Sequence, residues 1–226
     1  MYRLLNRLPF SNGLVFWLPL YEGTGTTAHD KSLNSNDGTI TGATWEKLNK
    51  YGCALNFDGE SYVDFGNVKE INIPSLSCVV WFKPEISSIG VTQFLIQQGG
   101  TVSHFQSLAT SIINSKPDEY IGNGIRGNRI YGTEIIKEGW VNFVSTREWN
   151  GINTTLKVYS NGILIDTLEV DWENSEDTVR DLILGAKSNL SSSYTGLIAE
   201  VTIWNRALSP TEITQLYNHQ KRIMGF

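Results

Sequence analysis

The sequence has few of the residues on which metal centres, disulfide frameworks and nucleophilic catalysis depend. It contains two cysteines, Cys53 and Cys78, and three histidines, His29, His104 and His219. Two cysteines are too few for a disulfide scaffold and lack the Cys/His spacing of a zinc site, so they fit two free buried thiols or one disulfide. No GxSxG elbow occurs, and the glycine-rich segment at 122–127 lacks the following helix of a phosphate-binding loop. These absences predict that the protein is not an enzyme.

Basic residues and long apolar runs are also scarce. Eighteen Lys and Arg residues against 23 Asp and Glu give a formal net charge of -5, which removes the attraction on which non-specific nucleic-acid binding depends. The apolar run at 14–20 is far shorter than the ~20 residues needed to cross a bilayer. It continues into Tyr21, Glu22 and Gly23 without a small-residue cleavage site, which is typical of a strand and not of a secretion signal. We expect no nucleic-acid partner, no membrane span and no signal peptide.

Turn signals are abundant. An Asn or Asp precedes Gly at six places, the pairing that type I′ hairpin turns require: Asn12-Gly13, Asp37-Gly38, Asp58-Gly59, Asn123-Gly124, Asn150-Gly151 and Asn161-Gly162. Short runs rich in β-branched and aromatic residues lie between them, at 77–82, 140–145, 156–160, 163–170, 182–185 and 198–204. The alternation at 156–160 predicts a hairpin over 156–168. The run at 77–82 is apolar on both faces and predicts a central strand.

One segment has the pattern of a helix. Ser209, Pro210 and Glu212 combine an N-cap serine, a proline at the first helical position and a capping-box glutamate, and Ile213 and Leu216 follow at helical spacing. No linker or internal repeat divides the chain. We therefore expect an N-terminal extension at 1–12, one domain at 13–220 and a C-terminal tail at 221–226.

Several stretches, in order along almost the whole chain, resemble the laminin-G-like domain of the concanavalin-A-like lectin/glucanase superfamily. They lie at 13–45, 54–66 (ALNFDGESYVDFG), 76–84 (LSCVVWFKP), 139–167, 182–188 (LILGAKS) and 194–217. The resemblance implies an all-β fold, a two-sheet antiparallel jelly-roll sandwich with one short C-terminal helix. It also implies that Phe57, Trp81 and Trp140 are core residues and that Trp204 packs the last strand.

The resemblance further implies a calcium ion near the loop that contains Asp30. Calcium takes six to eight oxygens, and Asp30 and Asn36, with Asn34 and Asp37, would supply them opposite Glu200. Family members usually have an acidic pair in the last strand, whereas this chain has only Glu200 in its Ile-Ala-Glu segment at 198–200. The alternative is an Asx-rich turn that holds its own backbone.

One motif resembles a catalytic site of the same superfamily. Glu169, Asp171 and Glu173 have the ExDxE form of some retaining glucanases, in which two glutamates must approach to ~5 Å. The motif trails a predicted hairpin strand and continues into Asn174, Ser175, Glu176 and Asp177. It therefore favours a solvated acidic loop, and a glycoside hydrolase that uses Glu169 and Glu173 is a minor alternative.

Ligand contacts are expected where aromatic residues lie beside turns. Trp149, Trp172, Tyr120 and Tyr131 neighbour Asn150, Asn123, Arg126 and Arg129, and sugar binding pairs aromatic rings with planar hydrogen-bonding groups. The ligand-binding prediction comprises Trp149, Trp172, Tyr120, Tyr131, Asn123 and Arg126. The alternative is that these aromatic residues only cover the ends of the sandwich.

Two functions follow as hypotheses. The first is a non-catalytic module that binds a glycan or protein partner for adhesion, outside cells or as part of a phage or viral virion. The second is a structural or decoration protein of a virion or other assembly, which predicts a homo-oligomer or contacts with capsid or tail proteins. An exported role without a signal peptide favours a virion component released by lysis.

Overall fold

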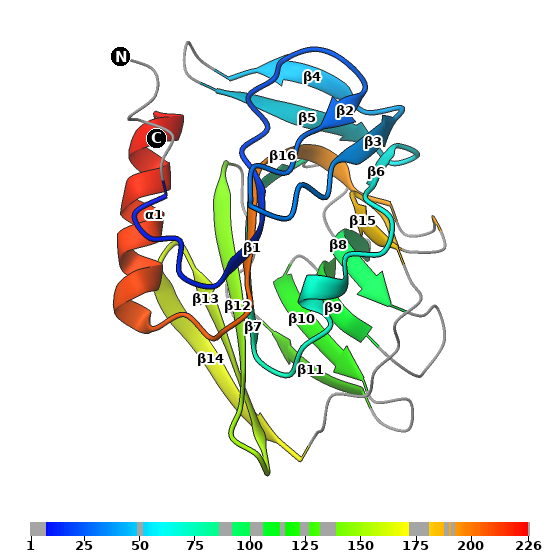
Figure 1. Cartoon of the computed structure of the whole chain (residues 1–226). Helices are drawn as coiled ribbons and strands as arrows, with labels where there is room; N and C mark the ends of the chain where they lie inside the picture. Colours follow the sequence, from blue (N-terminus) through cyan, green and yellow to red (C-terminus); the bar gives the residue numbers. More distant parts are fainter. Residues whose placement is uncertain are drawn as a thin grey trace.

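The structure is a computed structural model of the chain, and it describes residues 8–48, 52–85, 92–99, 106–113, 116–122, 127–131, 139–171, 181–187, 190 and 193–225. These residues form two antiparallel sheets, a 3-10 turn, η1 (Lys69–Ile71), and a C-terminal helix, α1 (Pro210–Met224) (Figure 1). The expected fold class, an all-β two-sheet sandwich with a terminal helix, is confirmed. None of the helices in these described ranges is long and apolar enough to span a membrane.

We name the two sheets A and B. Sheet A has the spatial order β14 (Ile163–Val170), β13 (Thr154–Ser160), β12 (Val141–Trp149), β7 (Leu76–Pro84), β16 (Thr195–Trp204), β5 (Cys53–Asp58) and β4 (Thr44–Lys47), and β1 (Leu14–Leu18) also pairs with β16. Sheet B has the order β11 (Gly127–Tyr131), β10 (Lys116–Gly122), β9 (Gln106–Ile113), β8 (Gln93–Gly99), β15 (Leu182–Leu184), β6 (Tyr62–Asp64), β3 (Gly38–Thr41) and β2 (Thr27–Ala28).

The predicted central strand lies in the middle of sheet A. Strand β7 pairs with β12 on one side and with β16 on the other. Cys78, Val80 and Phe82 point toward sheet B, while the alternate residues Val79 and Trp81 point toward α1. Both faces are therefore buried, which explains why this segment shows no alternation of apolar and polar residues.

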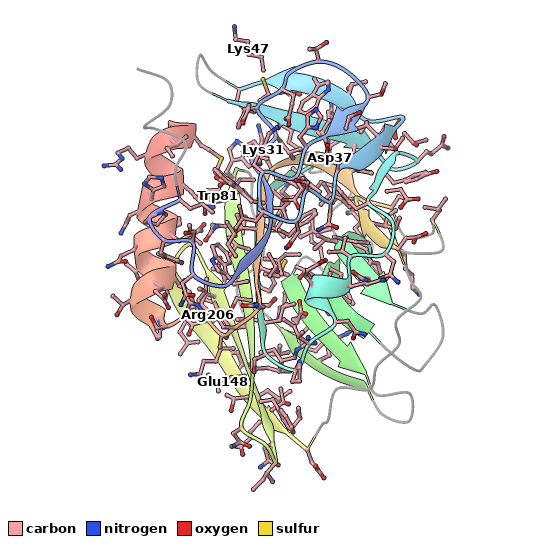
Figure 2. All side chains as sticks on the ribbon, viewed as in Figure 1. Lys31, Asp37, Lys47, Trp81, Glu148 and Arg206 are labelled. Carbon is pink, nitrogen blue, oxygen red and sulfur yellow. The ribbon has the colours of Figure 1, made fainter. Side chains whose placement is uncertain are left out.

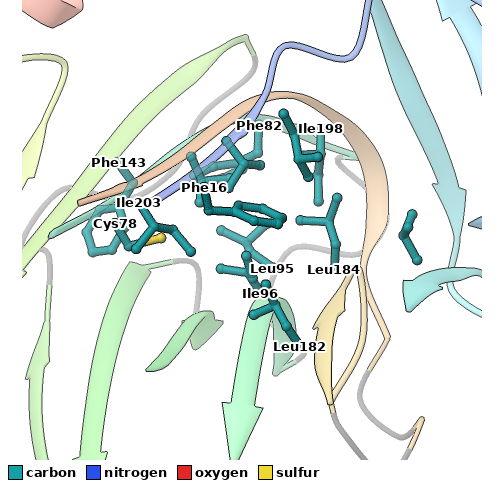
Figure 3. Close-up of a cluster of buried hydrophobic side chains, with 14 of the residues drawn as sticks. Phe16, Cys78, Phe82, Leu95, Ile96, Phe143, Leu182, Leu184, Ile198 and Ile203 are labelled. Carbon is teal, nitrogen blue, oxygen red and sulfur yellow. The ribbon is translucent and has the colours of Figure 1, made fainter. Parts of the chain in front are cut away.

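The main core fills the space between the sheets. Phe16 of β1, Phe82 of β7 and Ile198 of β16 meet Leu95 and Leu184 of sheet B there (Figure 3). Phe57 belongs to the same cluster and is fully buried, as expected. Its ring lies where a Cβ on Gly185 would be, 2.3 Å away, and Gly185 has φ +84, so no other residue fits that position easily.

Helix α1 covers the outer face of sheet A (Figure 1). A second apolar cluster joins strands β7, β12, β13 and β16 to the helix and the segment before it: Val79, Val144, Tyr159, Trp204, Leu208, Ile213 and Leu216. Trp81 is also buried on this side and lies between the helix and the sheet (Figure 2). The tryptophans expected in the core thus belong to the helix-covered face and not to the space between the sheets.

The helix begins as the sequence predicts. Glu212 N donates to Ser209 Oγ at 3.3 Å, and Ser209 N donates back to Glu212 Oε2 at 2.9 Å, so the capping box is complete. Arg206 adds a hydrogen bond of 2.6 Å to Glu212 Oε1. The helix runs to Met224, beyond the boundary at residue 220 that the sequence indicated, because Gln220 and Met224 are buried against sheet A.

The turn signals have different structural causes. Asn161 and Gly162, between β13 and β14, both have positive φ (51° and 81°), and the predicted hairpin is confirmed. The hairpin prediction for Asp37-Gly38 is wrong. Gly38 opens β3 without a positive φ, and a Cβ there would lie 2.4 Å from the Phe65 ring, so the glycine serves close packing.

Cys53 and Cys78 are both free thiols. Cys78 is buried on the inner face of β7, while Cys53 is half-buried at the start of β5. The first of the two alternatives from the sequence, free thiols without a disulfide, is therefore the one observed.

Candidate functional site

The hairpin formed by β10 and β11 carries an unusual group of charged and aromatic side chains. Tyr131 lies directly opposite Asp118, and Arg129 lies opposite Tyr120. Arg129 Nε is 3.0 Å from Asp118 Oδ2, an ion pair in which the carboxylate side chain is fully buried. The two strands thus place an acid, a guanidinium and an aromatic ring together.

These residues lie on the face of sheet B that points away from sheet A, which we call the outer face of sheet B. Successive side chains of a strand point to opposite faces. Ile112 of β9 and Ile130 of β11 belong to the core between the sheets. Their neighbours in sequence, Ser111, Arg129 and Tyr131, therefore belong to the outer face, together with Asp118, which is opposite Ser111 and Tyr131.

Burial raises the pKa of Asp118 to about 6, although a hydrogen bond from Ser111 and the charge of Arg129 oppose this shift. Ser111 Oγ donates to Asp118 Oδ1. The carboxylate is therefore poorly solvated and held by two protein groups. The buried carboxylate holds the guanidinium of Arg129, whose side chain is 30% exposed and can donate to a ligand.

Two further side chains extend this group along the sheet. Phe94 of β8 lies opposite Ser111, and Lys187 Nζ is 5.6 Å from the centroid of its ring. Tyr131 is 43% exposed and so offers its ring to solvent beside the ion pair. We call the set Phe94, Ser111, Asp118, Arg129, Tyr131 and Lys187 the sheet B site.

The sheet B site has the chemistry of a polyhydroxylated ligand site. The exposed ring of Tyr131 offers a flat apolar surface to C–H groups, while the guanidinium of Arg129, held by Asp118, offers a planar set of donors. The described part of the chain contains no cluster of three or more His, Cys, Asp or Glu residues that could hold a metal ion.

The residues predicted to contact a ligand fall in three places. Tyr131 is in the sheet B site, and Tyr120 lies in β10 opposite Arg129, although its side chain is outside the described part. Trp149 is 38% exposed at the end of β12 in the other sheet, where its backbone N–H donates to Ser75 Oγ. Trp172, Asn123 and Arg126 lie outside the described residues.

Asp30 organises the loop in which calcium was expected. Oδ1 accepts hydrogen bonds from Trp17 N (2.9 Å) and Ser32 N (2.8 Å), while Oδ2 accepts from Ser32 Oγ (2.8 Å) and Asn36 N (2.9 Å). Asn34 Nδ2 donates to Val15 O. Both carboxylate oxygens therefore already have protein donors, as in the turn that holds its own backbone.

Glu200 lies on the other side of Trp17. Glu200 Oε1 accepts a hydrogen bond of 2.9 Å from the Trp17 indole, whereas Asp30 accepts from the Trp17 backbone. Burial raises the pKa of Glu200 to about 7, against hydrogen bonds from Trp17 and Gln220. This donor set does not fit a calcium ion shared by Asp30, Asn36 and Glu200, because hydrogen-bond donors occupy both carboxylates. Calcium binding stays a prediction.

Glu169, the first glutamate of the ExDxE motif, is exposed on the edge strand β14. Its Oε1 accepts a hydrogen bond of 2.8 Å from Asn153 Nδ2. Glu173, its expected partner, lies outside the described residues. Glu169 thus lies on an exposed sheet edge, hydrogen-bonded to a neighbouring strand end.

The sequence offered only a weak signal for the acidic half of the sheet B site. Asp118 follows Pro117, and prolines within a strand are uncommon, so β10 has no clear strand pattern. Ser111 lies in β9, eight residues whose polar and apolar positions become interpretable only once the register to β8 and β10 is known. Pairing between strands, and not any linear motif, brings Asp118 to Arg129.

Comparison with known proteins places this geometry in context. A family model described as the concanavalin A-like lectin/glucanases superfamily (Laminin_G_3) matches residues 57–214. No curated protein is significantly similar to the chain.

Three solved structures have similar folds. The binding domain of Paraclostridial Mosquitocidal Protein 1 aligns with a TM-score of 0.71 at 16% identity, covering 92% of this chain and 52% of that one. Botulinum neurotoxin type C, in a structure on cell entry through two ganglioside molecules, gives 0.68 at 16% identity, with 91% and 51% coverage. Domain 4 of the extracellular arabinanase AbnA from Geobacillus stearothermophilus, in complex with arabinotriose, gives 0.66 at 20% identity, with 90% and 98% coverage. The chain thus spans about half of the two toxin chains and nearly all of the arabinanase domain.

Proposed function

The chain belongs to the concanavalin A-like lectin/glucanase superfamily, and we propose that it is a non-catalytic glycan-binding module whose ligand lies on the outer face of sheet B. One observation supports this proposal above the others. A buried carboxylate, Asp118, is paired with Arg129 at 3.0 Å beside the exposed ring of Tyr131. Because burying an ion pair contributes little net stability, the pair is better explained by its positioning of Arg129 beside Tyr131.

The known ligands of similar folds support the same class of ligand. The arabinanase domain was solved with arabinotriose, and the structure of botulinum neurotoxin type C concerns two ganglioside molecules. A polymeric glycan as ligand favours an extracellular place of action, as for the arabinanase. Glu169, exposed and bonded to Asn153, supports a binding role over hydrolysis.

The proposal is tested by a broad glycan array followed by calorimetric titration of the best ligand. Tyr131→Ala should weaken binding by about two- to tenfold, because an aromatic ring contact contributes roughly 0.5–1.5 kcal/mol. Trp149→Ala is the matched control, since Trp149 is exposed to a similar degree but lies on sheet A.

An equal loss of glycan affinity in Tyr131→Ala and Trp149→Ala would contradict a binding site on sheet B. A flat array response for the parent protein would contradict the proposed function itself. If the protein hydrolyses a bound glycan and Glu169→Gln abolishes this activity, the proposal that the module is non-catalytic is contradicted.

A further inference from the structure

A hollow lies on the side of the sandwich opposite the sheet B site, where the C-terminal half of α1 meets sheet A. Trp81, Trp140, Asn161, Tyr217 and Lys221 line it. They come from β7, the residue before β12, the turn after β13 and two successive turns of the helix. Three of the five are aromatic, which is a high proportion for a small surface depression.

The aromatic wall of this hollow is rigid. The rings of Trp81 and Tyr217 are stacked, with centroids 5.7 Å apart and planes within 6° of each other. Trp81 is 2% exposed, and its Nε1 donates to Gln220 Oε1 at 2.8 Å. Trp81 therefore fixes Tyr217 from below, whereas Trp140 and Tyr217 are only half-buried and can present their ring surfaces to a ligand.

One side of the hollow is cationic. Lys221 Nζ lies 5.6 Å from the centroid of the Tyr217 ring. The aromatic face attracts the ammonium and favours this position of the lysine side chain. In a chain with a net charge of -5, this lysine is a local exception to the overall sign.

A buried amide beside the hollow has no hydrogen-bond partner among the described residues. Asn142 is 1% exposed and lies directly opposite Trp81, on the helix-facing side of the sheet. Neither the Nδ2 nor the Oδ1 atom of Asn142 makes a hydrogen bond to the described residues. A buried polar group left without a partner costs free energy, so such a group is unusual unless something else satisfies it.

Asn161 connects that amide to the hollow. Asn161 Oδ1 accepts a hydrogen bond of 3.0 Å from Asn142 N, and Asn161 N donates to Asn142 O at 2.8 Å. The side chain of Asn161 is thereby fixed at the edge of the hollow. Two amides, one lining the hollow and one next to two of its lining residues, lie together beside the aromatic wall.

These features point to one class of ligand. We propose that the hollow binds an acidic sugar residue, a pyranose ring that carries a carboxylate, at a site separate from the sheet B site. The C–H face of the sugar packs on Trp140 and Tyr217. Its carboxylate pairs with the Lys221 ammonium, and a hydroxyl forms a hydrogen bond with the side chain of Asn161 at the edge of the hollow.

The experiment compares methyl β-D-glucuronide with methyl β-D-glucoside, which differ only in the carboxylate at C6. Each is titrated into the whole protein while the indole N–H signals of the tryptophans are followed by NMR. The glucuronide should shift the Trp81 and Trp140 signals and bind about tenfold more tightly than the glucoside. Equal affinities, or shifts confined to other tryptophans, would overturn the proposal.

Variants separate a specific site from general electrostatics. Lys221→Met keeps the alkyl stem over Tyr217 and should abolish the preference for the glucuronide, while Lys221→Arg should retain it. Arg222→Met, the next residue on the helix and exposed, is the matched control and should change nothing. An equal loss in Arg222→Met would overturn the proposal.

A further variant keeps the test independent of the sheet B site. Trp140→Ala should weaken both sugars, and Tyr131→Ala should weaken neither. Loss of glucuronide binding in Tyr131→Ala would assign it to the sheet B site and overturn the proposal of a second one. Circular dichroism and thermal unfolding of each variant establish that it is folded.

Discussion

The outer faces of the two sheets differ in what their aromatic and charged residues do. On sheet A, helix α1 covers the face, and Trp204, Tyr159 and Trp81 are buried beneath it. On sheet B, Tyr131 is exposed, and the charged pair of Asp118 and Arg129 lies next to it. The difference shows that aromatic residues are buried under a helix on one face and exposed beside charges on the other, which supports the proposal that the second face binds the ligand.

The largest expected effect lies on the covered face. Trp204, the last residue of β16, is fully buried beneath α1, and the centroid of its ring is 5.8 Å from that of Phe10. Trp204→Ala should lower the free energy of unfolding by about 3–5 kcal/mol, because it removes the buried ring and leaves a cavity. Urea unfolding followed by circular dichroism measures this value. A change below about 1 kcal/mol would show that α1 is not part of the stabilising core.

A buried acid on the covered face, Glu200, should make the stability of the protein depend on pH. The pKa of Glu200 is raised to about 7, so the folded protein retains a proton that the unfolded chain loses near its ordinary value of about 4. Stability should therefore fall as pH rises from about 4 to about 7 and stay level above that range.

Glu200→Gln removes this titration while keeping an oxygen that can accept the Trp17 hydrogen bond. Its stability relative to the parent should be greater at pH 8 than near pH 4.5, as measured by urea unfolding at both values. The buried acids Asp118 and Glu119 are present in both proteins and cancel in the difference. An identical pH dependence in the two proteins would contradict the burial of Glu200 as a cost to folding.

The helix cap should have a smaller effect. Ser209→Ala removes the acceptor for Glu212 N and should lower the free energy of unfolding by about 1 kcal/mol. Ser193→Ala, a substitution of the same kind away from the helix, is the control. If Ser209→Ala and Ser193→Ala change the free energy of unfolding equally, the capping box does not anchor α1.

Tyr131→Ala should have the smallest effect on stability. The side chain is 43% exposed, so its removal should change the free energy of unfolding by no more than about 0.5 kcal/mol. Thermal and urea unfolding measure this change. A loss comparable with that of Trp204→Ala would make Tyr131 a structural residue and remove the contrast between the two faces.

Much of the fold could be predicted from the sequence where local chemistry decides it. The capping box at Ser209 and the turn at Asn161-Gly162 act within a few residues, and both are found as predicted. Gly38 shows the limit of such signals. An Asp-Gly pair indicates a turn locally, but Phe65, distant in sequence, is what requires a glycine there.

The candidate site was less predictable because it depends on strand register. Tyr131 could be chosen as an aromatic residue beside a turn, yet Asp118 becomes its neighbour only through the pairing of β10 with β11. Glu200 illustrates the converse. The sequence suggested that it faces Asp30 across a metal ion. The sequence could not indicate that its carboxylate accepts a hydrogen bond from the Trp17 indole on the helix-covered side.

Mapping the ligand on the protein tests the central claim most directly. Backbone amide NMR spectra should be recorded during titration with the best neutral glycan from the array. We predict that the shifts cluster on β8, β10 and β11, at Phe94, Asp118, Arg129 and Tyr131, and are lost in Tyr131→Ala. Shifts that cluster instead around Trp149, or that persist unchanged in Tyr131→Ala, would contradict glycan binding by the outer face of sheet B.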